Sequence, residues 1–186
     1  MFAPSFAPGE EVIGELERMG LSPDDVDLVI NSHLHMDHCG GNEFFKKATC
    51  VVHARELETA RDPAMEGKGY FRADWDHARP FRAVEGEHDL FGDGRVVLIP
   101  APGHTPGMMV ALVGLDRTGL ILLSSDTVLM RENLEEAIVP KNTWSAPALL
   151  DSLQEVRRWK ARGALLVFGH DPEQWASLRK GSDAYE

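Results

Sequence analysis

The sequence predicts a single layered α/β domain over residues 1–186, and three observations support this. A chain of 186 residues has the length of one domain and can bury a core without disulfides or a structural metal. Its 43% apolar and 26% charged residues lie in the globular range. Short apolar runs typical of strands alternate with helical patterns, and we find no repeats, linkers or low-complexity tracts.

The N-terminal half is expected to mix helices and strands. Apolar residues recur at helical spacing from Val12 to Met19, and Gly20 is typical of a helix end. The elements expected here, in order, are a helix over 12–19, a turn at 22–25, buried strands over 26–30 and 49–52, and a helix over 54–61. Residues 63–75 are rich in glycine and charge, so we expect a loop or lid over a site.

The C-terminal half is richer in strands. Glycine turn signals near residues 92–94 and 116–119 separate apolar runs. The elements expected here are strands over 95–100, 108–114 and 119–124, an amphipathic helix over 148–161, a short strand over 165–168 and a final helix. Asp171 is placed to cap that final helix, with Pro172 at its first position.

Charge and hydropathy argue against several classes of protein. Thirty Asp and Glu against nineteen Lys and Arg give a formal net charge of −11, which disfavours a nucleic-acid partner or an acidic membrane surface. No apolar run approaches the roughly 20 residues that span a bilayer, and residues 1–8 lack the pattern of a signal peptide. Cys39 and Cys50 are too few for a disulfide framework, so we expect a cytoplasmic protein.

The segment His33–His38 contains the closest grouping of potential metal ligands in the sequence. It places three imidazoles and one carboxylate within six residues, directly after a predicted strand. Divalent zinc takes imidazole nitrogen and carboxylate oxygen as ligands. On extended backbone, the side chains of His33 and His35 can bind the same ion. Asp37 and His38 would then be directed toward a different position. The segment therefore predicts a metal site.

Three later residues share a setting with this segment. His104, Asp126 and His170 each follow a predicted strand and are flanked by small or turn residues. Taken singly, each is more often structural than a ligand. Together with the first cluster, they favour a shared metal centre.

The sequence resembles the metallo-β-lactamase superfamily, whose His-x-His-x-Asp-His hallmark is matched by His33, His35, Asp37 and His38. Within it the chain looks most like the N-acyl-homoserine lactone lactonases, through residues 32–42, 102–107 and 168–174. The resemblance implies an αββα sandwich. It also implies two zinc ions, the first held by His33, His35 and His104, the second by Asp37, His38 and His170, with Asp126 bridging them.

Two departures from the lactonase pattern stand out. Lactonases of this branch usually carry a tyrosine three residues after the bridging aspartate, and this chain has Leu129 there. Leucine cannot donate a hydrogen bond, so either the metal alone polarises the carbonyl or another group such as Tyr70 substitutes. The family also has strands before the helix that opens this chain, so we expect a sandwich that is incomplete at its N-terminus and a chain that is a fragment of a longer protein.

The implied mechanism is hydrolysis of a lactone, above all an N-acyl-homoserine lactone, which is quorum quenching. Two ions roughly 3.5–4 Å apart share a water and lower its pKa to about 7, so a bridging hydroxide is the expected nucleophile. Asp126 is the first candidate to pass a proton to the leaving group, and Asp37 is its competitor.

Alternatives within and outside this fold stay open. A thioesterase of the glyoxalase II type needs a helical extension, yet only 16 residues follow His170. A β-lactamase lacks the bridging carboxylate, a ribonuclease needs a basic surface, and an iron oxidoreductase would carry Glu in place of His35. Other esterases and a non-catalytic fragment complete the set. The expected partner is a small lactone or ester, with a homodimer and secretion as open alternatives.

Overall fold

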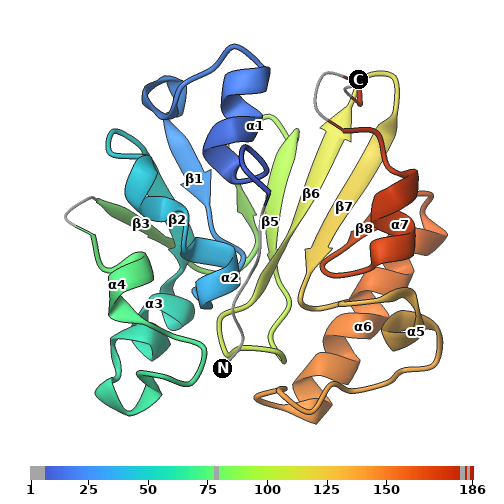
Figure 1. Ribbon diagram of the computed structural model, residues 1–186. Coiled ribbons are helices and arrows are strands. Elements are labelled where there is room, and N and C mark those ends of the chain that lie inside the picture. The colour runs from blue at the N-terminus through green and yellow to red at the C-terminus, as the bar shows by residue number, and fades with distance from the viewer. Residues whose placement is uncertain (1–6, 78–79, 181–182, 184) are drawn as a thin grey trace.

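Two β-sheets face each other, and helices cover their outer surfaces (Figure 1). The computed structural model describes residues 7–77, 80–180, 183 and 185–186. Among these residues, no helix combines the length and the apolar character that a membrane span requires.

The first sheet has three parallel strands in the order β1-β2-β3. The strands are β1 (Leu28–Ile30), β2 (Thr49–His53) and β3 (Phe81–Val84). Helices α3 (Ala54–Arg61) and α4 (Arg72–Trp75) lie on its outer side, as Figure 1 shows. His53 caps α3, because its ring Nδ1 accepts a hydrogen bond from the Arg55 amide.

The second sheet has five strands in the order β4-β5-β6-β7-β8. Its strands are β4 (His88–Asp89), β5 (Val96–Pro100), β6 (Met109–Leu115), β7 (Gly119–Ser125) and β8 (Leu165–Phe168). The pairs are antiparallel except β7 and β8, which run parallel with a register shift between Leu123 and Ser125. Helices α5 (Arg131–Glu135), α6 (Ala146–Ala161) and α7 (Pro172–Ser177) follow on this side of the molecule.

Three apolar clusters account for the layers. One joins Val51 and Val84 of the first sheet to Leu98 and Met109 of the second, so it is the core between the sheets. A second packs α3 and α4 on the first sheet, and a third packs α6 on the second sheet. Burial of apolar surface at the three interfaces between the layers stabilises the helix–sheet–sheet–helix arrangement. The expected αββα sandwich is confirmed.

Most of the expected elements are confirmed with small shifts of their bounds. Helix α1 spans Val12–Arg18, and Gly20 adopts a positive φ of 73°, which favours glycine just after a helix end. The expected turn at 22–25 contains a 3₁₀ turn over Pro23–Asp25. Asp171 caps α7 by accepting a hydrogen bond from the Gln174 amide at 2.8 Å.

The structure departs from the expected elements at three places. The strand over 26–30 is shorter and only partly buried, because it is the edge of its sheet and Ile30 is 37% exposed. The short helix α2 (Met36–Cys39), which carries Asp37 and His38, was not expected. Residues 63–75 do form a loop over a site, since Met65, Lys68 and Gly69 line the cavity beside the histidines, but Tyr70 and Trp75 are buried in the cluster with α3, so the segment is not a free lid.

Candidate metal centre

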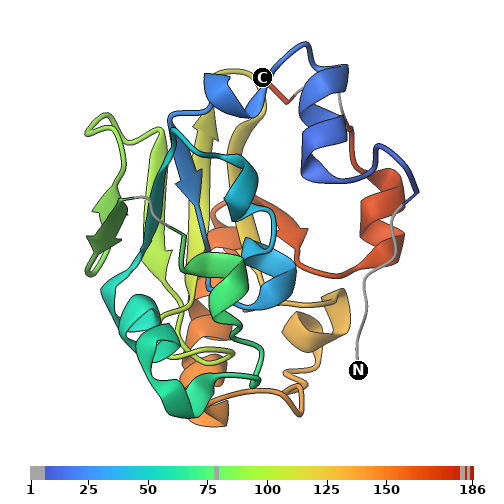
Figure 2. The same cartoon turned by 60° about the vertical axis from the view of Figure 1, so that its left-hand side comes forward.

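Four chain segments bring the seven predicted site residues to one end of the two sheets. His33–His38 follows β1, His104 lies in the loop between β5 and β6, Asp126 follows β7 and His170 follows β8. Figure 2 shows α2 and the chain leading to α5 at this same end. The carboxyl ends of strands from both sheets therefore supply the side chains.

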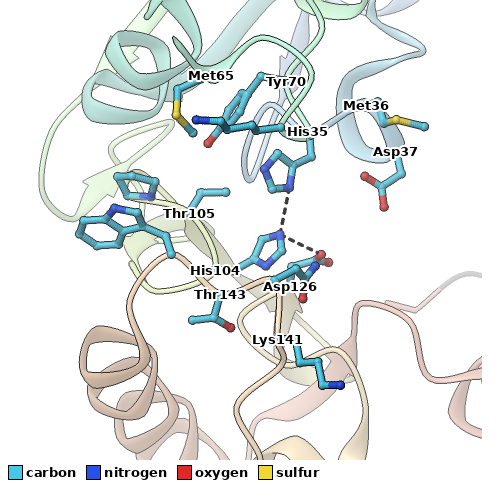
Figure 3. A pocket seen from close by; sticks show the side chains of 15 residues that line it. His35, Met36, Asp37, Met65, Tyr70, His104, Thr105, Asp126, Lys141 and Thr143 are labelled. Atoms are coloured by element: carbon cyan, nitrogen blue, oxygen red, sulfur yellow. Dashed lines mark hydrogen bonds and ion pairs between the residues drawn. The ribbon is translucent and has the colours of Figure 1, made fainter. Parts of the chain in front are cut away.

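His33, His35 and His104 form the first group. Their candidate ligand atoms all lie within 4.8 Å of one another. His35 Nδ1 lies 3.0 Å from His104 Nε2, and the two rings face each other across the pocket (Figure 3). His33 is fully buried and its ring centroid lies 4.7 Å from that of His35.

Asp37, His38 and His170 form the second group, with ligand atoms again within 4.8 Å of one another. The Nε2 atoms of His38 and His170 lie 3.4 Å apart. An Asp37 carboxylate oxygen is 3.7 Å from His38 Nε2 and 3.8 Å from His170 Nε2. The group is more open than the first, since half-exposed side chains contribute to it.

Asp126 lies between the two groups. Its Oδ1 is 3.1 Å from both His38 Nε2 and His170 Nε2, and its Oδ2 is 3.3 Å from His104 Nε2. The residue is only 5% exposed. One buried carboxylate thus contacts imidazoles of both groups.

The donor set fits divalent metal ions. His33 Nε2 is buried without a hydrogen-bond partner among the described residues, although a buried polar atom normally has one. Ligand nitrogens around a tetrahedral zinc, each about 2.0–2.1 Å from the ion, lie about 3.3 Å apart. The separations of 3.0 and 3.4 Å between facing imidazole nitrogens are close to this value.

Burial and neighbouring charges set the protonation states of these side chains. Burial lowers the pKa of His33 well below its ordinary value, that of His35 to about 4, and also that of His104. Although burial alone would raise the pKa of Asp126, the contacts from His170 and His38 hold it well below its usual range. Asp126 in turn raises the pKa of His170. Neutral imidazoles and an ionised carboxylate are the forms that bind metal.

A cavity of about 570 Å³ opens beside the two groups. His35, His104 and Asp126 reach into it, and Met65, Tyr70 and Trp144 contribute apolar surface to its wall. In Figure 3 the Lys141 side chain points away from His104. The site therefore combines a polar, metal-compatible floor with a largely apolar approach.

Tyr70 does not offer its hydroxyl to this cavity. The side chain is 1% exposed, and its hydroxyl donates a 2.8 Å hydrogen bond to Glu56 Oε1. The expectation that Tyr70 could replace the missing tyrosine at Leu129 is therefore wrong. Leu129 contributes its backbone carbonyl, which accepts a 2.8 Å hydrogen bond from the His170 amide.

Several supporting residues escaped the sequence analysis. Ser32 and Ser125 place hydroxyls beside ring nitrogens of His33 and His38, respectively. Glu56 is fully buried in α3 and accepts hydrogen bonds from both histidine-bearing loops. The available signal was a glutamate on the same helix face as the buried Ala60, four residues further on.

Comparison with known proteins decides the family. The model of the metallo-beta-lactamase superfamily matches residues 4–178, which is nearly the whole chain. The chain belongs to the metallo-β-lactamase superfamily. As a member of this superfamily it is a metal-dependent hydrolase of lactonase-like sequence.

Several relatives of this superfamily member are N-acyl homoserine lactonases. It is 34% identical to N-acyl homoserine lactonase AttM of Azorhizobium caulinodans, covering 100% of this chain and 73% of the relative. It is 29% identical to an N-acyl homoserine lactonase of Bacillus thuringiensis, covering 95% of this chain and 68% of the relative.

The fold of this superfamily member agrees with a solved structure of an N-acyl homoserine lactone hydrolase, in which the product N-hexanoyl-L-homoserine is bound at the catalytic metal centre. The TM-score is 0.83 at 29% identity, and the match covers 95% of this chain and 68% of the other. The architecture is therefore that of the lactonases over the matched region.

Proposed function

We propose that this chain holds two zinc ions and hydrolyses N-acyl-homoserine lactones, which would make it a quorum-quenching lactonase. The similarity to lactonases of 29–34% identity supports the substrate class. The apolar wall formed by Met65, Pro106 and Trp144 suits an acyl chain better than a highly charged substrate.

The contact of Asp126 with both groups is the observation that carries this proposal. Its two oxygens lie within 3.3 Å of imidazoles of both groups, as a carboxylate shared by two ions must. We assign His33, His35 and His104 to the first ion, Asp37, His38 and His170 to the second, and Asp126 to both. Three imidazoles suit zinc at the first position.

When bound, the two ions would supply a hydroxide nucleophile at neutral pH and polarise the lactone carbonyl. Ring opening adds the elements of water: the carbonyl carbon gains a hydroxyl, the ring C–O bond breaks, and the leaving oxygen gains a proton. Asp126 is our first candidate to move that proton, because its buried carboxylate is ionised and lies between the groups. Asp37, which is a third exposed, is the competitor.

We also propose that the chain forms one domain and acts in the cytoplasm. The cluster between the sheets joins strands from both halves of the sequence, which supports a single folding unit. Cys39 and Cys50 are buried thiols, and burial raises the pKa of Cys39, which keeps that thiol protonated and unreactive.

The test combines zinc stoichiometry with turnover of a substrate panel on the same preparation. The expected result is two zinc ions per chain and faster hydrolysis of N-acyl-homoserine lactones than of simple esters, thioesters or a β-lactam. Asp126→Asn should lower kcat/KM by at least about a hundredfold, since it removes the shared charge.

A matched control is Asp116→Asn, because Asp116 is an exposed carboxylate in the turn between β6 and β7. It should turn over lactones like the wild type. Fewer than two zinc ions in the wild type, or a preference for esters over lactones, would contradict the proposal.

A further inference from the structure

Glu56 is a buried carboxylate that the reaction itself does not use. It lies in α3, is fully buried, and accepts four hydrogen bonds. Oε1 accepts from the Leu34 amide at 3.0 Å and from the Tyr70 hydroxyl at 2.8 Å. Oε2 accepts from the Thr105 hydroxyl at 2.7 Å and from the Gly107 amide at 3.0 Å. These four donors satisfy the two carboxylate oxygens.

Three of the four donors come from the segments that carry the first group of histidines. Leu34 lies between His33 and His35, and Thr105 follows His104 directly. Tyr70 packs its ring edge-on against His35, with centroids 4.7 Å apart. One carboxylate therefore links the loop that carries His35 to the loop that carries His104. The facing ring nitrogens of these two histidines lie 3.0 Å apart.

The loop that carries His104 packs so closely on α3 that there is no room for a side chain at position 107. A Cβ added at Gly107 would lie 2.2 Å from the Glu56 backbone nitrogen. The loop between β5 and β6 therefore sits directly on the first turn of α3, where the Glu56 side chain can reach it. Packing brings the loop close, and the hydrogen bonds to Oε2 fix where Thr105 and its neighbour His104 lie.

The second group has different support. Within the described part of the chain, no hydrogen bond joins Glu56 to Asp37, His38 or His170. His38 and His170 contact Asp126, and His38 also lies 3.4 Å from the Ser125 hydroxyl. Loss of the Glu56 carboxylate should therefore affect one metal position and spare the other.

We propose that Glu56 is a positioning residue that sets the separation of the His33–His35 and His104 loops and thereby the affinity of the first metal position. This inference rests on the proposed two-metal function. Groups that orient metal ligands typically alter metal affinity 10–100-fold when they are replaced. An amide at position 56 keeps the shape but replaces one acceptor with a donor that faces other donors.

The experiment is a zinc titration of the full chain against a chromophoric chelator, in wild type and Glu56→Gln. We expect the affinity for one ion to fall about 10–100-fold and the other to change less than about threefold. NMR of ¹⁵N-labelled imidazoles should show that His35 and His104 lose the zinc-bound signals first. Glu58→Gln, an exposed glutamate in the same helix, is the matched control and should bind zinc like the wild type.

A second pair of variants covers the case in which Glu56→Gln does not fold. Thr105→Val removes a single donor to Oε2 and should weaken the same ion, whereas Thr105→Ser keeps the hydroxyl and should restore it. Equal weakening of both ions, or unchanged affinities with only a lower Tm, would overturn the inference. If the wild type binds fewer than two zinc ions, the proposed function fails instead.

Discussion

The hydroxyl of Ser32 lies 2.8 Å from the hydroxyl of Ser125, which joins two segments 93 residues apart in the chain. Ser32 Oγ is also 3.1 Å from His33 Nδ1, and Ser125 Oγ is 3.4 Å from His38 Nδ1. The hydroxyl pair thus touches one imidazole of each metal group. Ser125 takes a positive φ of 44°, which is costly for a residue other than glycine, and such strained residues cluster at functional sites.

Replacing Ser125 by Ala should lower kcat/KM for lactones by about tenfold, because an imidazole that binds metal through Nε2 needs a partner for its Nδ1 proton. Ser32→Ala should have a similar effect. The double variant should lose less than the product of the two effects, since both changes break the same contact. Steady-state kinetics of the four proteins test this, and strictly multiplicative losses would contradict a shared role.

Asp126→Asn should lower the pKa of His170 in the metal-free protein. The contact with Asp126 is the main cause of the raised pKa of His170, and an asparagine carries no charge to stabilise the imidazolium. An NMR titration of the imidazole protons measures this directly. We expect the midpoint above 6.5 in the wild type and at or below 6.5 in the variant. An unchanged midpoint would show that Asp126 does not control His170.

Metal-free protein should lose stability in mild acid because of His35. Its folded-state pKa is about 4 against an ordinary value of 6.5. Between these pH values the unfolded chain binds the proton and the folded chain does not, so acid favours unfolding. The free energy of unfolding should fall by about 3 kcal/mol from this residue between pH 6.5 and 4.

Urea unfolding of wild type and His35→Gln across this range isolates the contribution of His35. The difference between the two proteins should shrink or reverse as the pH falls, because only the wild type has this proton to take up. Parallel curves would contradict the lowered pKa.

Gly69→Ala should disturb both stability and metal binding. An added Cβ would lie 2.6 Å from His35 Cδ2 and 2.8 Å from its Nε2, at a φ of 91° that disfavours alanine. We expect a loss of about 2–4 kcal/mol in the free energy of unfolding, together with weaker zinc binding. Gly67→Ala is the control, because Gly67 has a φ of 80° but nothing within 4 Å. It should cost about 1 kcal/mol and leave zinc binding intact.

Much of the fold could be predicted because local signals agree with the global arrangement. Helix α3 and strand β8 have the predicted bounds, since α3 consists mainly of good helix formers and β8 is a short continuous apolar run. The strands β3 and β4 were missed, because at four and two residues they are too short for an alternating pattern to stand out. Burial of Tyr70 and Trp75 could not be seen either, since it depends on tertiary contacts with α3 and with Leu34 and Cys39.

The sequence was enough to predict which residues form the candidate site, but not how neighbouring side chains hold them in position. His33, His35, Asp37 and His38 stand together in the sequence, and the strand-end positions of His104, Asp126 and His170 suggested that they join them. The residues that hold the candidate ligands in place, Ser32, Ser125 and Glu56, could not be predicted. A serine or a buried glutamate carries no local signal of the distant segment that it will contact, since Glu56 bonds groups 14 to 51 residues away and Ser32 contacts a hydroxyl 93 residues away.

The separation of the site residues along the chain determines when the site can form. His35 and His104 are 69 residues apart, and His38 and His170 are 132 apart. Closing such long segments is slow and entropically costly, so the donor set is complete only after the two sheets have docked. Zinc should therefore have little effect on the folding rate. It should instead slow unfolding, because separating the sheets would first require release of the ions.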